Sequence, residues 1–135
     1  MFDLHGAERL LAWKSFRNQL ESDNSPFQSV VEFWAKAPLV NFYLDPNQPS
    51  CWPDPWHLII DGRYDDLAVV LGMLYTIKLT DRFSNINLEI YMSAEEKNTI
   101  FFLKADKNIL NLEYNRVIDV SKLYDIESIK IYTAR

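Results

Sequence analysis

DGRYDDLAVVLGMLYTIKLTD, residues 61–81, is the stretch around which the rest of the chain can be organised. Asp65 and Asp66 fall where the first turn of a helix would begin, and negative charge is favourable there because that end of the helix dipole is positive. From Leu67 to Ile77 nearly every residue is apolar, which predicts a helix that is buried on most sides. Gly72 lies inside this helix and predicts a close approach by another backbone.

The residues before this helix predict two more helices. Apolar residues recur at helical spacing over residues 7–22, namely Leu10, Trp13, Phe16 and Leu20. Ser25 and Gln28 form a capping-box pattern with a proline between them, which predicts a second helix over residues 26–36.

A proline-rich segment then separates these helices from the central one. Residues 41–56 contain four prolines and cannot form long regular structure. We expect an ordered loop there, pinned by Trp52 and Trp56, with a short helical turn from Pro55.

After Asp81 the apolar residues alternate, which is typical of strands. The predicted strands are residues 86–92, 99–105, 109–114 and 128–134, with a short segment at 116–120 and a tight turn at 106–108. We therefore predict an α+β fold in which N-terminal helices and a central buried helix pack on an antiparallel β-sheet. We expect one domain over residues 1–135, with a helical part at 1–50 and a core at 51–135.

Composition excludes several classes of protein. The chain has 135 residues and a net charge of -5, so it lacks the basic character expected of a nucleic-acid-binding protein. Its single cysteine excludes an internal disulfide framework and favours a reducing compartment. It has no signal-peptide pattern and no apolar run of about 18 residues, so we expect synthesis in a cytoplasm and no membrane partner.

The segment GRYDDLA, residues 62–68, resembles a motif of the transglutaminase-like, papain-like cysteine peptidase superfamily. In the bacterial branch the helix opens with Gly-Asp-Cys-Asp/Glu-Asp-x-Ala, and the cysteine is the nucleophile. Four positions match in register, and Tyr64 occupies the nucleophile position. The order of helix, strand, hairpin and strand agrees as well, so the resemblance spans residues 52–120 and implies a transglutaminase- or papain-like core.

The resemblance also implies where the other catalytic residues would lie. The family histidine falls near Thr99 or Ile100, and the family aspartate falls near Asn111 or Glu113. A tyrosine with an ordinary pKa of about 10 is a poor acyl nucleophile, and we expect its ring to pack over the site. The implied site is therefore degenerate, with Tyr64, Asp65, Asp66, Thr99 and Glu113 around it, and we expect no enzyme activity and no cofactor.

Other chemistry in the chain is limited. Cys51 and His57 could form a thiol–base pair across the proline-rich loop, although a packed or partly exposed structural thiol is the alternative. His5 lies in the N-terminal segment, away from these residues, and two histidines with one cysteine make no zinc set. Asp61, Asp65 and Asp66 could attract a cation, but helix capping explains them without one.

The element Trp-Pro-Asp-Pro-Trp, residues 52–56, is similar to an element in small proteins of T4-like cyanophages. It could be a core plug, or its rigid Trp side chains could anchor an interface. The interface candidates are Trp52, Trp56, Trp13 and Trp34.

Together these observations predict a non-enzymatic structural or assembly protein of a tailed phage virion, in the neck, tail or baseplate. We expect its partners to be other virion proteins in a symmetric assembly, with no nucleic acid. The alternatives are an active thiol hydrolase using Cys51 and His57, or a phage factor that binds a host protein.

Overall fold

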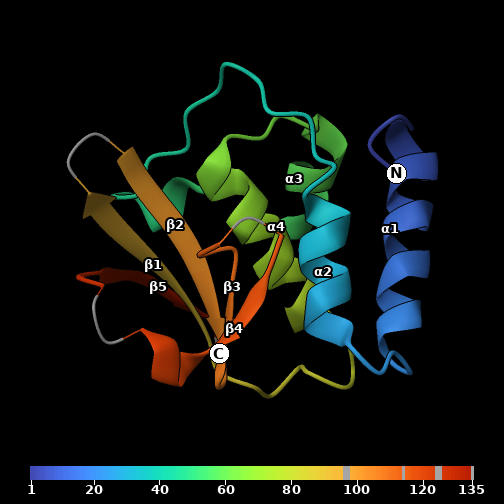
Figure 1. The fold of residues 1–135 in the computed structure, drawn as a ribbon. Coiled ribbons are helices and arrows are strands. Elements are labelled where there is room, and N and C mark those ends of the chain that lie inside the picture. The colour runs from blue at the N-terminus through green and yellow to red at the C-terminus, as the bar shows by residue number, and fades with distance from the viewer. Residues whose placement is uncertain (96–97, 114, 124–125, 135) are drawn as a thin grey trace.

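Helices occupy the first part of the chain and strands the second, as Figure 1 shows for this computed structural model. The structure describes residues 1–95, 98–113, 115–123 and 126–134. Within these ranges four α-helices precede a five-stranded antiparallel sheet. The predicted α+β class is therefore confirmed.

The two N-terminal helices lie where the apolar spacing placed them, and each ends two residues earlier than predicted. They are α1 (Gly6–Leu20) and α2 (Pro26–Trp34). The short helix α3 (Pro55–Asp61) begins after Asp54, whose carboxylate accepts a hydrogen bond from the backbone N–H of His57 at 2.9 Å. It ends at Gly62, which adopts the left-handed conformation with φ of 64°. Two further short 3₁₀ helices lie at Pro49–Cys51 and Val120–Lys122.

The predicted capping box at the start of α2 is wrong. Ser25 is the N-cap residue, but its side chain makes no capping hydrogen bond. The side-chain amide of Gln28 instead donates to the carbonyl of Asn115 at 3.1 Å. The backbone N–H of Ser25, which Gln28 was expected to bind, is instead bound by Asp23. The Asp23 carboxylate accepts hydrogen bonds from this N–H at 2.8 Å and from the Ser29 hydroxyl at 2.5 Å.

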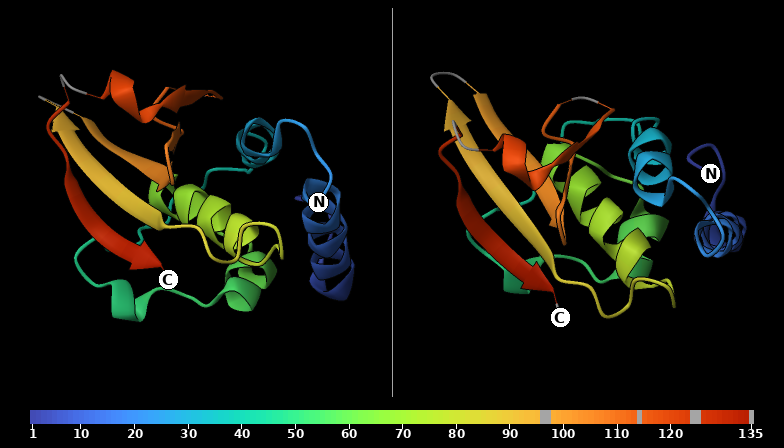
Figure 2. Two further views of the ribbon diagram at one scale, coloured as in Figure 1. Left: turned by 90° about the horizontal axis from the view of Figure 1, so that it is seen from below. Right: turned by 60° about the horizontal axis from the view of Figure 1, so that its bottom comes forward.

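The central helix α4 (Asp66–Lys78) is buried along most of its length, as predicted. Figure 2 shows it between the sheet on one side and α1 and α2 on the other. Burial of its apolar side chains against both layers contributes to the hydrophobic stabilisation of the core.

Gly72 of α4 allows a close approach, but by a side chain instead of the predicted backbone. A Cβ atom at this position would lie 2.3 Å from Cη2 of Trp34. One turn further on, the Thr76 hydroxyl accepts hydrogen bonds from Nε1 of Trp13 at 3.0 Å and Nε1 of Trp34 at 2.9 Å. The same hydroxyl donates to the carbonyl of Gly72 at 2.6 Å. These bonds connect α1, α2 and α4 at one buried atom.

The sheet has the order β4-β3-β2-β1-β5, and its pairings are antiparallel. The strands are β1 (Leu88–Glu95), β2 (Asn98–Ala105), β3 (Asn108–Leu110), β4 (Val117–Asp119) and β5 (Ile129–Ala134). The strand predicted over residues 109–114 is shorter than expected, because Asn111 has φ of 70° and turns the chain away from β2. The last residue of that prediction, 114, lies outside the described residues.

The face of the sheet opposite α4 has its own packing. The rings of Tyr91 and Phe102 stack with centroids 5.4 Å apart. Glu89 lies between Lys130 at 3.1 Å and Lys104 at 3.6 Å. Burial alone would raise the pKa of the Glu89 carboxyl, but the two lysines outweigh it and the pKa is lowered.

Candidate functional site

The start of α4 is fixed by Asp65, which is the N-cap residue. One carboxylate oxygen accepts a hydrogen bond from the backbone N–H of Ala68, and the other accepts from the backbone N–H of Leu44, both at 2.8 Å. Asp65 thus satisfies a free donor of the first helical turn and ties the proline-rich loop to the helix. The predicted capping role of Asp65 is confirmed.

Tyr64 precedes this cap and points into the core. Its side chain is 0% exposed and makes edge-to-face contacts with Trp34 and Phe2, at centroid distances of 5.4 Å and 5.7 Å. Burial raises the pKa of Tyr64 to about 12, and the neighbouring Arg9 guanidinium offsets only part of that increase. Within the described residues, the hydroxyl has no hydrogen-bond partner.

The N-terminal segment forms the cover over Tyr64. Arg9 holds it in place, donating from Nε to the carbonyl of Leu4 at 2.8 Å and from Nη2 to that of Phe2 at 2.9 Å. Its Nη1 also donates to the carbonyl of Ile59 at 3.2 Å, which joins the segment to α3. Gly62 leaves room for this guanidinium, since a Cβ there would lie 2.0 Å from Nη1 of Arg9.

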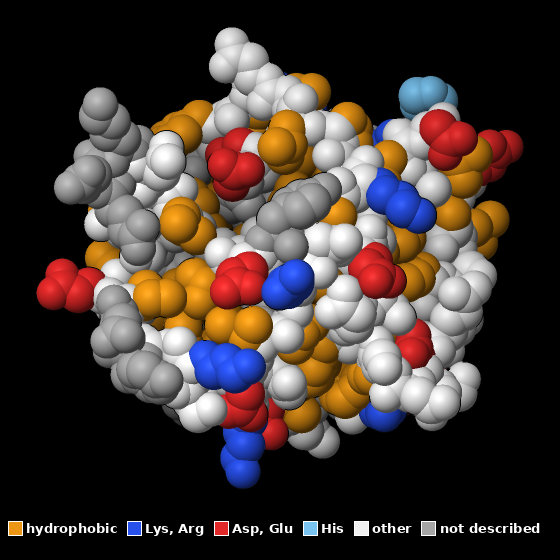
Figure 3. Space-filling model, viewed as in Figure 1, with side chains coloured by type: hydrophobic (Ala, Val, Ile, Leu, Met, Phe, Trp, Pro, Cys, Tyr) orange, Lys and Arg blue, Asp and Glu red, His pale blue; other side chains and the backbone are white. Residues whose placement is uncertain are grey.

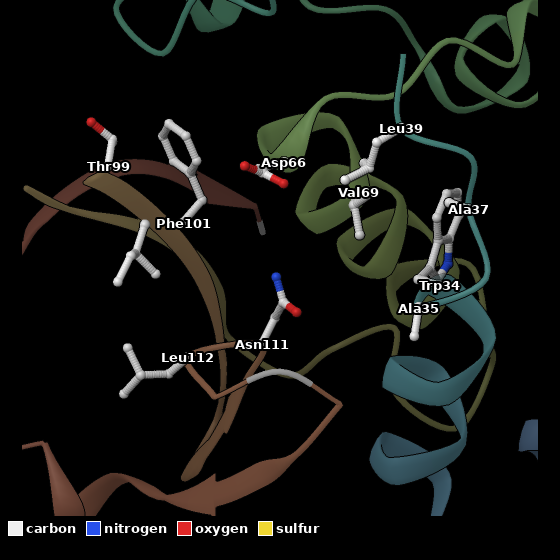
Figure 4. A pocket seen from close by; sticks show the side chains of 11 residues that line it. Trp34, Ala35, Ala37, Leu39, Asp66, Val69, Thr99, Phe101, Asn111 and Leu112 are labelled. Carbon is white, nitrogen blue, oxygen red and sulfur yellow. The ribbon is translucent and has the colours of Figure 1, made fainter. Parts of the chain in front are cut away.

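An open groove of about 370 Å³ lies on the other side of the helix start. Figure 4 shows the carboxylate of Asp66 and the amide of Asn111 projecting into the space between α4 and the strands. Leu39 and Val69 lie on the helical side of this space, and Phe101 lies on the strand side. On the face drawn in Figure 3, hydrophobic and acidic side chains surround a hollow to the upper left of the centre. The lining residues are Trp34, Ala35, Ala37, Leu39, Asp66, Val69, Thr99, Ile100, Phe101, Asn111 and Leu112.

The groove brings together part of the predicted degenerate site. Asp66, Thr99, Ile100 and Asn111 all line it, although they come from three separate stretches of the chain. Tyr64 does not line it, because its ring is turned toward Phe2 and Trp34. Of the two positions predicted for the family aspartate, the groove contains Asn111, whereas Glu113 lies 3.8 Å from Arg116 in an exposed ion pair.

Two polar side chains of the groove can make specific contacts with a ligand. Asp66 can accept hydrogen bonds or pair with a cation, and Asn111 can both donate and accept. Among the described lining residues there is no Cys, Ser, His or Lys, and the polar side chains are those of Asp66, Thr99 and Asn111.

Cys51 and His57 are both exposed and have different partners. The Cys51 thiol lies 3.4 Å from the side-chain carbonyl of Gln48. Nδ1 of His57 lies 2.7 Å from the Asp54 carboxylate. Among the described residues no hydrogen bond joins Cys51 to His57, so the predicted thiol–base pair is not assembled in this structure.

The four Trp residues divide into two groups. Trp13 and Trp34 are 0% and 1% exposed and belong to the core, so their prediction as interface residues is wrong. Trp52 is half-buried and pins the loop as expected, donating from Nε1 to the carbonyl of Asp45 at 2.7 Å. Trp56 is 47% exposed and contacts Trp13 instead of the loop, so it is an interface candidate that remains accessible.

Sequence reasoning missed Phe2 as the cover of Tyr64, and Leu39, Val69 and Leu112 as groove residues. A signal existed only for Leu39, an apolar residue directly after a proline that ends a helical pattern. Within the described parts of the chain, no cluster of His, Cys, Asp or Glu side chains is arranged to hold a metal ion. None of the helices described there has the length and apolar character needed to cross a bilayer.

Comparison with known proteins gives one informative likeness. No family model matches the chain, and no curated protein matches it. Among solved structures it is similar to calcium-bound LapG of Legionella pneumophila, with a TM-score of 0.67 and 14% sequence identity. The likeness covers 98% of this chain and 78% of LapG. It shows the transglutaminase-like, papain-like α+β fold that the motif at residues 62–68 predicted.

Proposed function

We propose that this chain is a non-enzymatic protein that acts through protein–protein contacts, as a structural or assembly component of a tailed phage virion. The observation that carries the non-enzymatic part is Tyr64, which occupies the nucleophile position of the resembled motif and is 0% exposed. A phenol with a pKa of about 12, covered by Phe2 and Trp34, cannot reach a substrate or form a phenolate near neutral pH.

The groove supports a binding role beside this inactive position. The histidine position of the resembled family falls near Thr99 or Ile100, and neither a hydroxyl nor an aliphatic side chain is a general base near neutral pH. Apolar walls with a few polar groups are typical of sites that bind a ligand.

Exposed apolar side chains support contact with other proteins. Leu39, Val40 and Tyr43 follow α2 in the loop that borders the groove, and they are 60%, 46% and 72% exposed. Trp56 and Ile60 lie four residues apart on α3, both 47% exposed. Of these residues, Tyr43 and Trp56 are of the aromatic types that are enriched in protein interfaces. The phage assignment rests on the resemblance of the element at residues 52–56 to small proteins of T4-like cyanophages.

Quantitative mass spectrometry of gradient-purified particles of the source phage tests the virion role. We expect a fixed copy number, on the order of six or twelve per particle, as for a component that forms a closed ring. Absence from particles together with abundance in infected cells would overturn the structural role and favour a factor that binds a host protein.

A separate assay tests the non-enzymatic part. The purified protein is incubated with thioester and peptide substrates, with Cys51→Ala as the matched variant. We expect no turnover by either protein. Turnover that disappears in Cys51→Ala would overturn the proposal and establish the thiol hydrolase alternative.

A further inference from the structure

We propose that the unpaired edge of β2 binds an extended segment of a partner protein as an added strand, with a Lys or Arg of that segment paired to Asp66. This inference rests on the proposed role in protein–protein contacts, and it names the surface and the chemistry of the partner. The site is the groove between the first half of β2 and the start of α4 (Figure 4).

The first half of β2 has a strand on one side only. Along its other edge β3 pairs with residues 103–105. The chain then leaves that edge at Asn111, whose φ of 70° ends the pairing. Over residues 98–102, β2 is paired to β1, and no other strand in the described parts of the chain pairs with it.

Hairpin geometry determines which backbone groups face this open edge. Ala105 pairs with Asn108 across a two-residue turn, so their N–H and C=O groups point toward each other. Backbone direction alternates along a strand, so the N–H and C=O groups of Leu103 point to the same edge as those of Ala105. The residues two and four positions before Leu103 face that edge as well. The N–H and C=O groups of Phe101 and Thr99 therefore point toward the groove, and both residues line it.

The walls of the groove suit alternating apolar side chains. Val69 and Leu39 lie opposite Phe101, and Leu39 is 60% exposed. A strand added to β2 would direct every second side chain toward these walls, because side chains alternate between the faces of a strand.

Charge determines which partner fits. Asp66 is the one charged residue in the lining, it is exposed, and it has no ion-pair partner among the described residues. With the net charge of -5, this carboxylate favours a cationic side chain on the added segment. It disfavours nucleic acid, whose phosphates would meet a carboxylate at the mouth of the groove.

The test uses a seven-residue peptide that alternates Val and Thr around a central Lys, capped at both ends, and a matched peptide with Glu in place of Lys. Binding to the full chain labelled with ¹⁵N is followed by amide chemical shifts and by amide hydrogen exchange. We expect the Lys peptide to shift the amides of Thr99 and Phe101 and to slow their exchange. Absence of binding, binding at other residues, or equal binding of the Glu peptide would overturn the proposal.

Two variants separate the charge from the strand pairing. Asp66→Asn should weaken the Lys peptide about fivefold, as expected for a partly exposed ion pair, whereas Asp61→Asn on α3 should not. Thr99→Pro removes one edge N–H without removing a bond to β1, and an edge position tolerates proline. If Thr99→Pro fails to fold, the affinity of Asp66→Asn for the Lys peptide still tests the proposal. An unchanged affinity in Asp66→Asn would contradict the proposed ion pair.

The peptide experiment and the particle analysis test the strand-addition site and the virion role independently. A protein present in virions that does not bind the Lys peptide leaves the proposed function standing and removes the strand-addition site. A protein absent from virions that binds the peptide at Thr99 and Phe101 removes the virion role and keeps the site.

Discussion

On one side of the start of α4, Tyr64 is covered by Phe2 and Trp34, and on the other side Asp66 borders an open groove. The two residues are two positions apart, with the N-cap Asp65 between them. The covered side contributes apolar burial to the stability of the fold, and the open side leaves a carboxylate and a strand edge accessible. The comparison shows that one helix start can be structural on one face and available for binding on the other.

The largest expected effect comes from opening the covered side. Trp34→Ala should lower the free energy of unfolding by about 3–5 kcal/mol, because the ring fills the space over Gly72 and Tyr64. Urea denaturation measures this. Trp56→Ala is the matched control, and with a side chain that is 47% exposed it should cost far less. Equal losses in the two variants would contradict the distinction between buried and accessible Trp residues.

High pH probes the same side through Tyr64. Its pKa is about 12 in the folded state, whereas the unfolded chain ionises near pH 10, so the folded state binds the extra proton between these values. Stability should therefore fall as the pH rises through this range, by up to about 1.4 kcal/mol per pH unit from Tyr64. Tyr64→Phe should show a smaller fall in alkaline denaturation series.

Tyr75 acts in the same direction, because burial also raises its pKa to about 12, and it remains in the Tyr64→Phe variant as an internal reference. At neutral pH, Tyr64→Phe should be as stable as the parent chain or more stable, since it removes a buried hydroxyl that has no partner among the described residues. A large loss at neutral pH would mean that the hydroxyl is hydrogen-bonded in solution.

A smaller effect is expected at the boundary between the two sides. Asp65→Ala should cost about 1–2 kcal/mol, because it removes the cap of α4 and the acceptor for the backbone N–H of Leu44. Thermal and chemical unfolding measure the change. Asp65→Asn should recover part of the loss, since Asn is also a good N-cap residue.

The smallest effect is expected on the open side. Asp66→Asn should change the free energy of unfolding by less than about 0.5 kcal/mol, because the residue is exposed and accepts no hydrogen bond from the described side chains. A loss as large as that of Asp65→Ala would show that Asp66 is structural, and the groove would then lack a free carboxylate.

The fold could be predicted from the sequence because its main elements carry strong periodic patterns. The apolar run at 67–77 gives a helix that is buried against two layers, and the alternation at 86–92 gives β1, an inner strand of the sheet that pairs with β2 and β5. The predicted capping box of Ser25 and Gln28 was wrong because other groups nearby bind the same atoms. Asp23 accepts from the backbone N–H of Ser25, and Gln28 donates to the carbonyl of Asn115.

The candidate site was predicted in part. The spacing of the resembled motif located Thr99, Ile100 and Asn111, which do meet at the groove. The direction of Tyr64 could not be predicted in detail, because its cover comes from Phe2 and Trp34, which are distant in sequence and follow no shared pattern. Aromatic residues at helical spacing are compatible with core or interface, and Trp34 belongs to the core because Thr76 accepts its indole N–H inside the protein.

The Thr76 hydroxyl has one proton to give and two lone pairs to receive, and the structure uses all three. That atom has no remaining capacity, so the two indole rings have no spare acceptor there if the hydroxyl is lost. The residues at positions 13, 34 and 76 should therefore vary together among related sequences. A related sequence that replaces Thr76 with an apolar residue should also replace both Trp residues, and the helices α1 and α2 should then change their position on α4 together.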